Sequence, residues 1–353
     1  MLSIGSRKVP MVGVDISSTA VKLLEFSKLK DGYRVESYGV EPLPANAVTE
    51  KNIQDVEAVG EALRRAVKKS GTRVKHAALA VAGSSVITKK ILMPANQTDE
   101  EMEFQIQAEA DQYIPYPLEE VYLDFEVLGE APNNPESVEV LLAASRAENV
   151  STRTAVADIA GLTAKIIDVE AYTIENAYTL ITNQIPDYGV DKTTAIVDIG
   201  ATMTSLNVID DGRLVYTREQ PFGGKQLTEE IMRRYGLSFE DAGRVKKEGG
   251  LPENYEPEVL QPFKQTMAQQ VGRFLQFFYS SGEHEHVDYI ALAGGCSSIP
   301  GIAELVESNL GIATGVADPF GHAKMASRVA KQRIINDAPS LMIACGLALR
   351  GVM

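Results

Sequence analysis

Two short segments, one in each half of the chain, join an aspartate to hydroxyl-bearing and small residues. The first contains Asp15, Ser17, Ser18 and Thr19, and the second contains Asp198, Gly200, Ala201 and Thr202. Small residues let backbone N–H groups approach an anion, and the hydroxyls add further donors. A carboxylate at a strand end can hold a hydrated Mg²⁺, which neutralises a triphosphate. Each segment is therefore a candidate phosphate contact, and Asp15 and Asp198 are candidate Mg²⁺ contacts through water.

Both segments belong to one longer pattern that occurs twice. In each copy an apolar strand ends at the aspartate, and a small-residue turn leads to a second apolar strand (residues 11–26 and 195–209). A polar turn, a third strand and helical sequence follow. An internal repeat of this kind predicts two similar α/β units. One such hairpin alone is weak evidence for a phosphate site, whereas two hairpins facing each other would hold a nucleotide from both sides.

A third segment fits the same ligand. Residues 289–293 form an apolar strand that ends at Gly294 and Gly295, and Ser297 and Ser298 precede a helix. A Gly-Gly turn that runs into a helix start lets the backbone approach a purine ring or an α-phosphate closely. Taken alone, the turn is a common feature. As the third member of an ordered set it supports a nucleotide site.

Composition limits the other possibilities. The chain has 353 residues and a formal net charge of −14, which argues against a nucleic-acid partner because phosphate contacts need a basic surface. No apolar run approaches the roughly 20 residues that span a bilayer. The two cysteines, Cys296 and Cys345, lie in apolar sequence, which is typical of reduced core thiols. These features predict a cytoplasmic globular protein of about two lobes.

The negative charge is concentrated in one region. Between Lys90 and Arg146 there are thirteen acidic residues and no Lys or Arg. A capping box at residues 98–101 begins a helix that we expect to end before Pro115, and residues 121–128 and 138–143 are expected to form strands. The region is therefore predicted to be a folded module, and its charge is either a solvated face or a docking surface for a basic partner.

In this order, the motifs resemble the superfamily of actin, sugar kinases and heat-shock ATPases. The hairpins at Asp15 and Asp198 match its two phosphate motifs, and residues 292–298 match its adenosine motif. Residues 168–177 and 339–350 match its two connecting helices. The resemblance covers essentially the whole chain and implies an actin-like (ribonuclease H-like) α/β fold of two duplicated lobes.

Within that superfamily, the acidic module resembles the inserted subdomain of the cell-division protein FtsA. The strings at residues 13–25 and 112–117 are similar to a related family, the type IV pilus assembly protein PilM. FtsA-like chains carry a basic amphipathic helix after the second connecting helix, and no such helix is expected here. The resemblance implies a first lobe core of residues 1–76 and 167–190 and an inserted subdomain of residues 77–166. It implies a second lobe core of residues 191–221 and 286–353, whose last helix returns to the hinge, and a small subdomain of residues 222–285.

The resemblance also assigns site residues. It adds to the nucleotide contacts a phosphate lysine, a segment that closes on the nucleotide, a ribose lysine and the adenosine motif: Lys22, Gly223, Gly224, Lys246, Gly294, Gly295, Ser297 and Ser298. Ser17 stands where a glycine is usual, and Gly243 where a glutamate is usual. Glu170 stands where ATPase members orient the attacking water, and the alternative interpretation is a strand-end or helix-cap acid. A partner groove is expected along Gln105, Glu109, Gln112, Tyr113, Pro115 and Tyr116.

The function implied by the resemblance is that of a scaffold. Such a protein binds ATP and Mg²⁺ between its lobes, with slow or no hydrolysis, and docks the N-terminal cytoplasmic tail of the membrane protein PilN. It is expected to lie at the inner face of the bacterial inner membrane through that partner, with no direct membrane insertion. Other pilus platform proteins, motor ATPases and a second copy of the chain are further candidate partners. The alternatives are an FtsA-like polymerising protein and a small-molecule kinase on the same fold.

Overall fold

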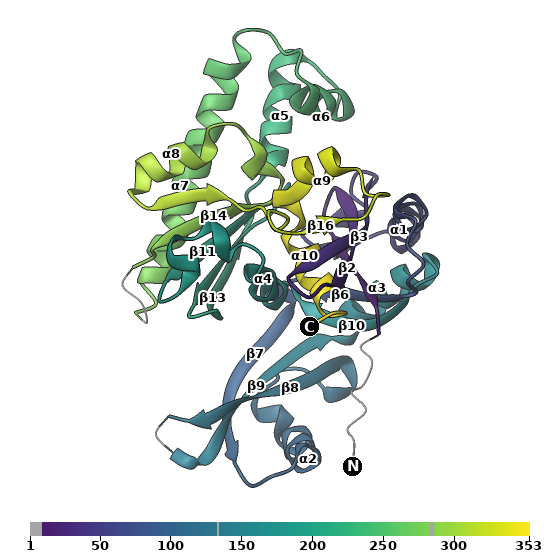
Figure 1. Ribbon diagram of the computed structural model, residues 1–353, viewed down its shortest axis with the longest axis vertical. Helices are drawn as coiled ribbons and strands as arrows, with labels where there is room; N and C mark the ends of the chain where they lie inside the picture. The colour runs from purple at the N-terminus through teal and green to yellow at the C-terminus, as the bar shows by residue number, and fades with distance from the viewer. Residues whose placement is uncertain (1–8, 133, 283–285) are drawn as a thin grey trace.

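The computed structural model describes residues 9–132, 134–282 and 286–353 (Figure 1). Two large sheets with their helices form the upper part of the view, and a smaller sheet with one helix extends below them. The smaller unit is built from β7, β8, β9 and α2, and it lies within the acidic region of the sequence.

The first sheet has six strands in the order β10-β6-β1-β2-β3-β16. Their bounds are β1 Met11–Ile16, β2 Ala20–Lys28, β3 Tyr33–Pro42, β6 His76–Val81, β10 Thr163–Val169 and β16 Lys324–Met325. The first three strands are antiparallel neighbours, and β6 and β10 are parallel to β1 and to each other. One face is covered by α1 (Val56–Ser70) and α3 (Ala147–Ile159), because both contribute apolar side chains to the core that contains Val12 and Val14.

The second sheet has five strands in the order β13-β12-β11-β14-β15. Their bounds are β11 Thr193–Ile199, β12 Thr204–Asp210, β13 Arg213–Gln220, β14 Tyr289–Ala293 and β15 Ala313–Val316. It repeats the first sheet: three antiparallel strands are followed by two parallel strands beside the first of them. The helices α7 (Gln261–Tyr279) and α8 (Ile302–Leu310) cover its outer face. The predicted duplication is therefore present in the topology.

Two helices lie between the sheets. The core that contains Leu24 of β2 and Ile196 of β11 also contains residues of α4 (Glu170–Tyr178) and α10 (Met342–Leu349). These are the two predicted connecting helices. The second is preceded by a short 3₁₀ turn, Ala338–Leu341, and α9 spans Lys331–Asp337. Although β16 lies in the stretch assigned to the second lobe, it pairs with β3 of the first sheet, so the end of the chain joins both lobes.

The inserted unit is an antiparallel sheet in the order β7-β9-β8, with bounds β7 Val86–Pro94, β8 Val121–Ala131 and β9 Asn134–Arg146. Met102 and Ile106 of α2 (Asp99–Glu109) pack on one face of the sheet. Thr98 and Glu101 form the predicted capping box. The α-helix ends at Glu109 and a 3₁₀ turn continues it to Gln112, while both strands run longer than the sequence indicated.

The remaining elements are β4 Val48–Thr49, β5 Asn52–Ile53, α5 Gly224–Tyr235 and α6 Phe239–Glu248. The pair α5 and α6 lies in the upper part of the molecule in Figure 1. None of the helices in the described parts of the chain combines the length and apolar character needed to cross a membrane.

Candidate functional site

The two repeated hairpins meet tip to tip. Thr202 Oγ1, in the turn between β11 and β12, donates a hydrogen bond to Ser18 Oγ, in the turn between β1 and β2, at 3.1 Å. Each turn is also closed internally: Ser17 N donates to Ala20 O at 3.0 Å, and Gly200 N donates to Met203 O at 3.0 Å. The structure therefore brings the two predicted phosphate segments together across the gap between the lobes.

Asp15 is the penultimate residue of β1 and is 4% exposed. Lys22 lies opposite Asp15 in the hairpin register, and its Nζ donates to Asp15 Oδ2 at 2.9 Å and to Ser340 O at 2.8 Å. Burial by itself would lower the pKa of Lys22, but the Asp15 carboxylate outweighs it and raises that pKa above its ordinary value. Lys22 therefore stays charged, neutralises Asp15 and ties the first hairpin to the turn before α10.

Asp198 is the penultimate residue of β11, the equivalent place in the second copy. Burial raises its pKa to about 6, against the opposing pull of Lys22 and Lys51, and the Asp15 carboxylate adds to the rise. Asp15 and Asp198 are therefore close enough to influence each other's charge. Gly294 lies against Asp198, since a Cβ at Gly294 would be 2.6 Å from Asp198 Oδ1, and its φ of +83° also favours glycine.

Glu170 is the first residue of α4 and is buried beside the two aspartates. Burial raises its pKa, with Asp15 adding to the rise and Lys51 opposing it. The Lys51 ammonium forms an ion pair with the Glu170 carboxylate and a second one, at 3.1 Å, with Glu219 Oε1. The structure thus places Glu170 in the same cluster as the phosphate hairpins, as the resemblance implied.

Sequence reasoning missed Lys51 and Glu219. Lys51 lies in a short polar stretch whose approach to the cleft is a tertiary feature, so no spacing indicates it. Glu219 could have been found, because it lies near the end of the third strand of the second copy, as Glu41 does in the first. Glu41 is also buried, but it forms ion pairs with Arg65 and Lys69 of α1.

The segments expected to contact the nucleoside lie on the other side of the second hairpin. Gly224 N donates to Gly200 O at 3.1 Å, and a Cβ at Gly223 would lie 2.6 Å from Ala201 O. Lys246 Nζ donates to Gly224 O at 3.1 Å and to Thr228 Oγ1 at 2.6 Å, so this lysine is already engaged. Burial lowers the pKa of Lys246.

The predicted adenosine motif forms a tight turn after β14. Ser297 is buried and its Oγ donates to Gly294 O at 2.6 Å, whereas Gly295 and Ser298 are exposed. A Cβ at Gly295 would meet nothing within 4 Å, so this position faces open space. Gly294 N donates to Pro339 O at 2.7 Å, which joins the motif to the turn before α10.

The charges of this cluster suit a hydrated divalent cation. Four carboxylates (Asp15, Glu170, Asp198 and Glu219) lie near two ammonium groups (Lys22 and Lys51). Glu219 Oε2 is buried and has no hydrogen-bond partner among the described residues. No group of three or more metal-type side chains is found in the described parts of the chain. The described side chains therefore offer no ready set of direct metal ligands at this cluster.

The raised pKa of Asp198 gives a pH dependence. An unfolded aspartate titrates near 3.9, so the folded protein binds more protons than the unfolded chain between about pH 4 and pH 6. The stability that Asp198 contributes is therefore full below about pH 4 and lost as the pH rises through about 6. We expect the difference in unfolding free energy between the wild type and Asp198→Asn to change by up to about 3 kcal/mol between pH 4 and pH 7. Urea unfolding of both proteins at four pH values measures it, and a constant difference would contradict the assignment.

The predicted partner-groove residues separate into two sets. Pro115 and Tyr116 line an open hollow of about 560 Å³ together with Asp111, Ile114, Pro117, Leu118 and Glu119. Gln105, Glu109 and Tyr113 instead bond to each other along α2: Gln105 Nε2 donates to Glu109 Oε1 at 3.0 Å and Tyr113 Oη donates to Glu109 Oε2 at 2.9 Å. Gln112 is exposed between the sets.

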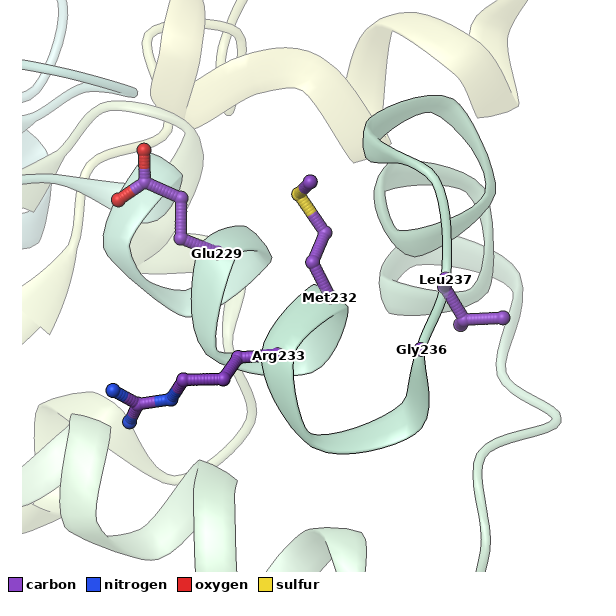
Figure 2. Close-up of a pocket in the computed structure, with 5 residues that line it drawn as sticks. All are labelled: Glu229, Met232, Arg233, Gly236 and Leu237. Atoms are coloured by element: carbon purple, nitrogen blue, oxygen red, sulfur yellow. The ribbon is translucent and has the colours of Figure 1, made fainter.

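A second hollow, of about 350 Å³, lies where α5 ends (Figure 2). Glu229, Met232 and Arg233 of α5 line it with Gly236 and Leu237 of the following turn. Gly224, which contacts the second phosphate hairpin, lies at the opposite end of this helix. At 1.5 Å per residue, the lining residues lie about 7 Å or more along the helix from that contact.

Comparison with known proteins identifies the family. A family model described as type IV pilus assembly protein PilM matches residues 13–352. The chain belongs to the PilM family. A solved structure of a PilM–PilN type IV pilus biogenesis complex superimposes with a TM-score of 0.80 and 27% identity, covering 98% of this chain and 99% of the matched chain.

Two other proteins show what the PilM-family chain is similar to. The cell-division protein FtsA of Bacillus subtilis is 24% identical over 352 residues, covering 87% of this chain and 78% of that protein. The structure of MreB5 of Spiroplasma citri bound to ADP superimposes with a TM-score of 0.50 and 13% identity, covering 98% of this chain and 96% of the other. The fold is therefore the actin-like duplicated α/β fold, as the motifs predicted.

Proposed function

We propose that the protein is an ATP-binding scaffold of the inner-membrane platform that assembles type IV pili. The observation that carries this proposal is the likeness to the PilM–PilN complex over nearly the whole chain. Membership of the PilM family supports a role in pilus assembly. The scaffold would bind the N-terminal cytoplasmic tail of PilN and so lie at the inner face of the membrane through its partner. Other platform proteins, motor ATPases and a second copy of this chain are candidates for further contacts.

The nucleotide part of the proposal is supported by the contact between the two hairpins. The hydroxyls of Ser18 and Thr202 meet at this contact, so the two turns face each other and could hold phosphates from two sides. MreB5, which shares the fold, was solved with ADP. When bound, Mg²⁺ would neutralise phosphate charge, and Asp15 and Asp198 would orient its waters. Because Glu170 is paired with Lys51, we expect ATP to bind with slow or no hydrolysis.

The partner part of the proposal rests on the hollow beside the inserted helix. Asp111 and Glu119 place negative charge at its rim, and Ile114, Tyr116 and Leu118 supply apolar walls. A short tail with a basic residue and apolar side chains would match this surface. Arg146 lies over the Tyr116 ring at 4.5 Å, which holds one wall in position.

Charge reversal at the hollow tests the docking site. We expect Asp111→Lys to weaken binding of a synthetic PilN tail peptide about tenfold at low salt and to flatten its salt dependence. Glu109 is a poorer choice, because its carboxylate holds Gln105 and Tyr113. Fluorescence anisotropy at two salt concentrations, with and without Mg·ATP, measures the effect. Asp31→Lys, in an exposed turn of the first lobe, is the matched control. Equal affinity for both variants would show that charge at the hollow does not contribute.

A further inference from the structure

Lys51 lies in an unusual turn. Val48–Thr49 and Asn52–Ile53 form a hairpin whose two central residues, Glu50 and Lys51, have φ values of 48° and 66°. A two-residue hairpin turn in which both central residues have positive φ values normally contains Asn-Gly or Gly-Gly, because most other residues are strained in the left-handed region. Here neither central residue is a glycine. Surrounding contacts must therefore hold the turn in place.

Arg153 supplies one of those contacts. Its buried guanidinium donates to Lys51 O at 3.2 Å, to Ala80 O at 2.5 Å and to Asn149 O at 3.0 Å. The backbone of the turn is thus fixed to α3 and to the end of β6. The Lys51 side chain extends from this fixed point toward the cleft and is 17% exposed.

The partners of Lys51 come from different lobes. Glu170 begins α4, next to the first sheet, whereas Glu219 ends β13 of the second sheet. Both side chains are about nine-tenths buried, with exposures of 11% and 10%. Burial lowers the pKa of Lys51, but the two carboxylates outweigh it and hold that pKa above its ordinary value. The Lys51 ammonium therefore remains charged. Without it, the two carboxylates would repel each other.

We propose that Lys51 is a positioning residue that holds Glu170 and ties the second lobe to the first through Glu219. Without a ligand, this Lys51 bridge keeps the lobes together and keeps Glu170 from orienting a water. The bridge also adjoins the root of the inserted unit, because a Cβ at Gly83 would lie 3.6 Å from Glu219 Oε1. If the bridge breaks, the packing of Glu219 against the segment that leads into β7 would therefore change as well. This inference deepens the proposed function, since it concerns the same cleft.

Amide hydrogen exchange of the full-length, ligand-free protein tests the bridge, because exchange reports local opening. We expect Lys51→Met to increase exchange at least tenfold in β13 and in the first turn of α4, with little change elsewhere. Adding Glu219→Gln to this variant should lower the exchange only in part, because it removes the repulsion between the two acids and does not restore the bridge. Lys192→Met, which removes an ammonium paired at 3.6 Å with the exposed Asp187, is the control and should leave both segments unchanged.

Two results would overturn the proposal: unchanged exchange in Lys51→Met, or a uniform increase along the chain that Glu219→Gln does not lower. If Lys51→Met fails to fold, Glu219→Gln alone decides the question, since it leaves the pair with Glu170 intact. It should raise exchange in β13 and not in α4, and a change below twofold in β13 would count against the bridge. Titration of wild-type protein with Mg·ATP reports separately on the proposed function, because the exchange experiment contains no nucleotide.

Discussion

Asp198→Asn is expected to lower the affinity for Mg·ATP at least 100-fold and, at the same time, to stabilise the ligand-free protein at pH 7. The loss of affinity follows from the proposed function, in which Asp198, near the end of β11, is one of two carboxylates that would hold a hydrated Mg²⁺. The gain in stability follows because burial raises the pKa of Asp198 to about 6, so keeping it ionised at neutral pH is unfavourable. A shift of this size corresponds to about 1–3 kcal/mol in the free energy of unfolding.

Calorimetric titration and thermal unfolding of the same preparations measure both effects. Asp31→Asn is the control, since Asp31 is an exposed aspartate in a turn of the other copy and should change neither quantity. Opposite signs for binding and stability distinguish a ligand site from a structural carboxylate, whose removal would lower both. Retention of Mg·ATP affinity within threefold in Asp198→Asn would remove the proposed role of the second hairpin.

The second large effect, on the free energy of unfolding, is expected where α4 and α10 cross. A Cβ at Gly346 of α10 would lie 1.8 Å from Thr173 O of α4, so the two backbones are in direct contact. On the other side of α10, a Cβ at Gly13 of β1 would lie 2.3 Å from Ala344 O. An added methyl group at Gly346 cannot be absorbed by a side-chain movement, because backbone atoms surround it. We expect Gly346→Ala to lower the free energy of unfolding by at least about 3 kcal/mol.

Gly346→Ala should also change the positions of side chains in the cleft between the lobes. Glu170 begins α4, and the turn before α10 carries Ser340 O and Pro339 O, which accept hydrogen bonds from Lys22 Nζ and Gly294 N. If the two helices separate, the Ser340 and Pro339 carbonyls would move away from Lys22 and Gly294, their hydrogen-bond donors. Mg·ATP affinity should therefore fall along with stability.

Gly243→Ala provides the matched control for the helix crossing. Gly243 lies within α6, and a Cβ there would meet nothing within 4 Å. Alanine in an open helical position should raise the free energy of unfolding by about 0.5–1 kcal/mol. Chemical denaturation of both variants gives the comparison. A loss below 1 kcal/mol in Gly346→Ala would show that the helices can separate at little cost.

The sequence by itself determined the architecture of this protein. The repeated strand–aspartate–turn pattern predicted two similar sheets, and both have the same strand order. The expected capping box is present, and most of the stretch between Lys90 and Arg146, which lacks Lys and Arg, forms the small sheet with α2. These features were readable because alternation, caps and turns are set by residues close together in the chain. The motifs at Asp15 and Asp198 were found for the same reason, since each is a local string.

The tertiary structure decided which side chains meet. The contact of Ser18 with Thr202 and the bridging of Glu170 and Glu219 by Lys51 have no signature in spacing. Ion pairs and close backbone contacts depend on how sheets and helices are placed relative to each other, which short stretches of sequence do not specify. A lysine in a polar turn has the same local sequence whether it faces solvent or a buried pair of acids, and only the packing of the lobes selects between them.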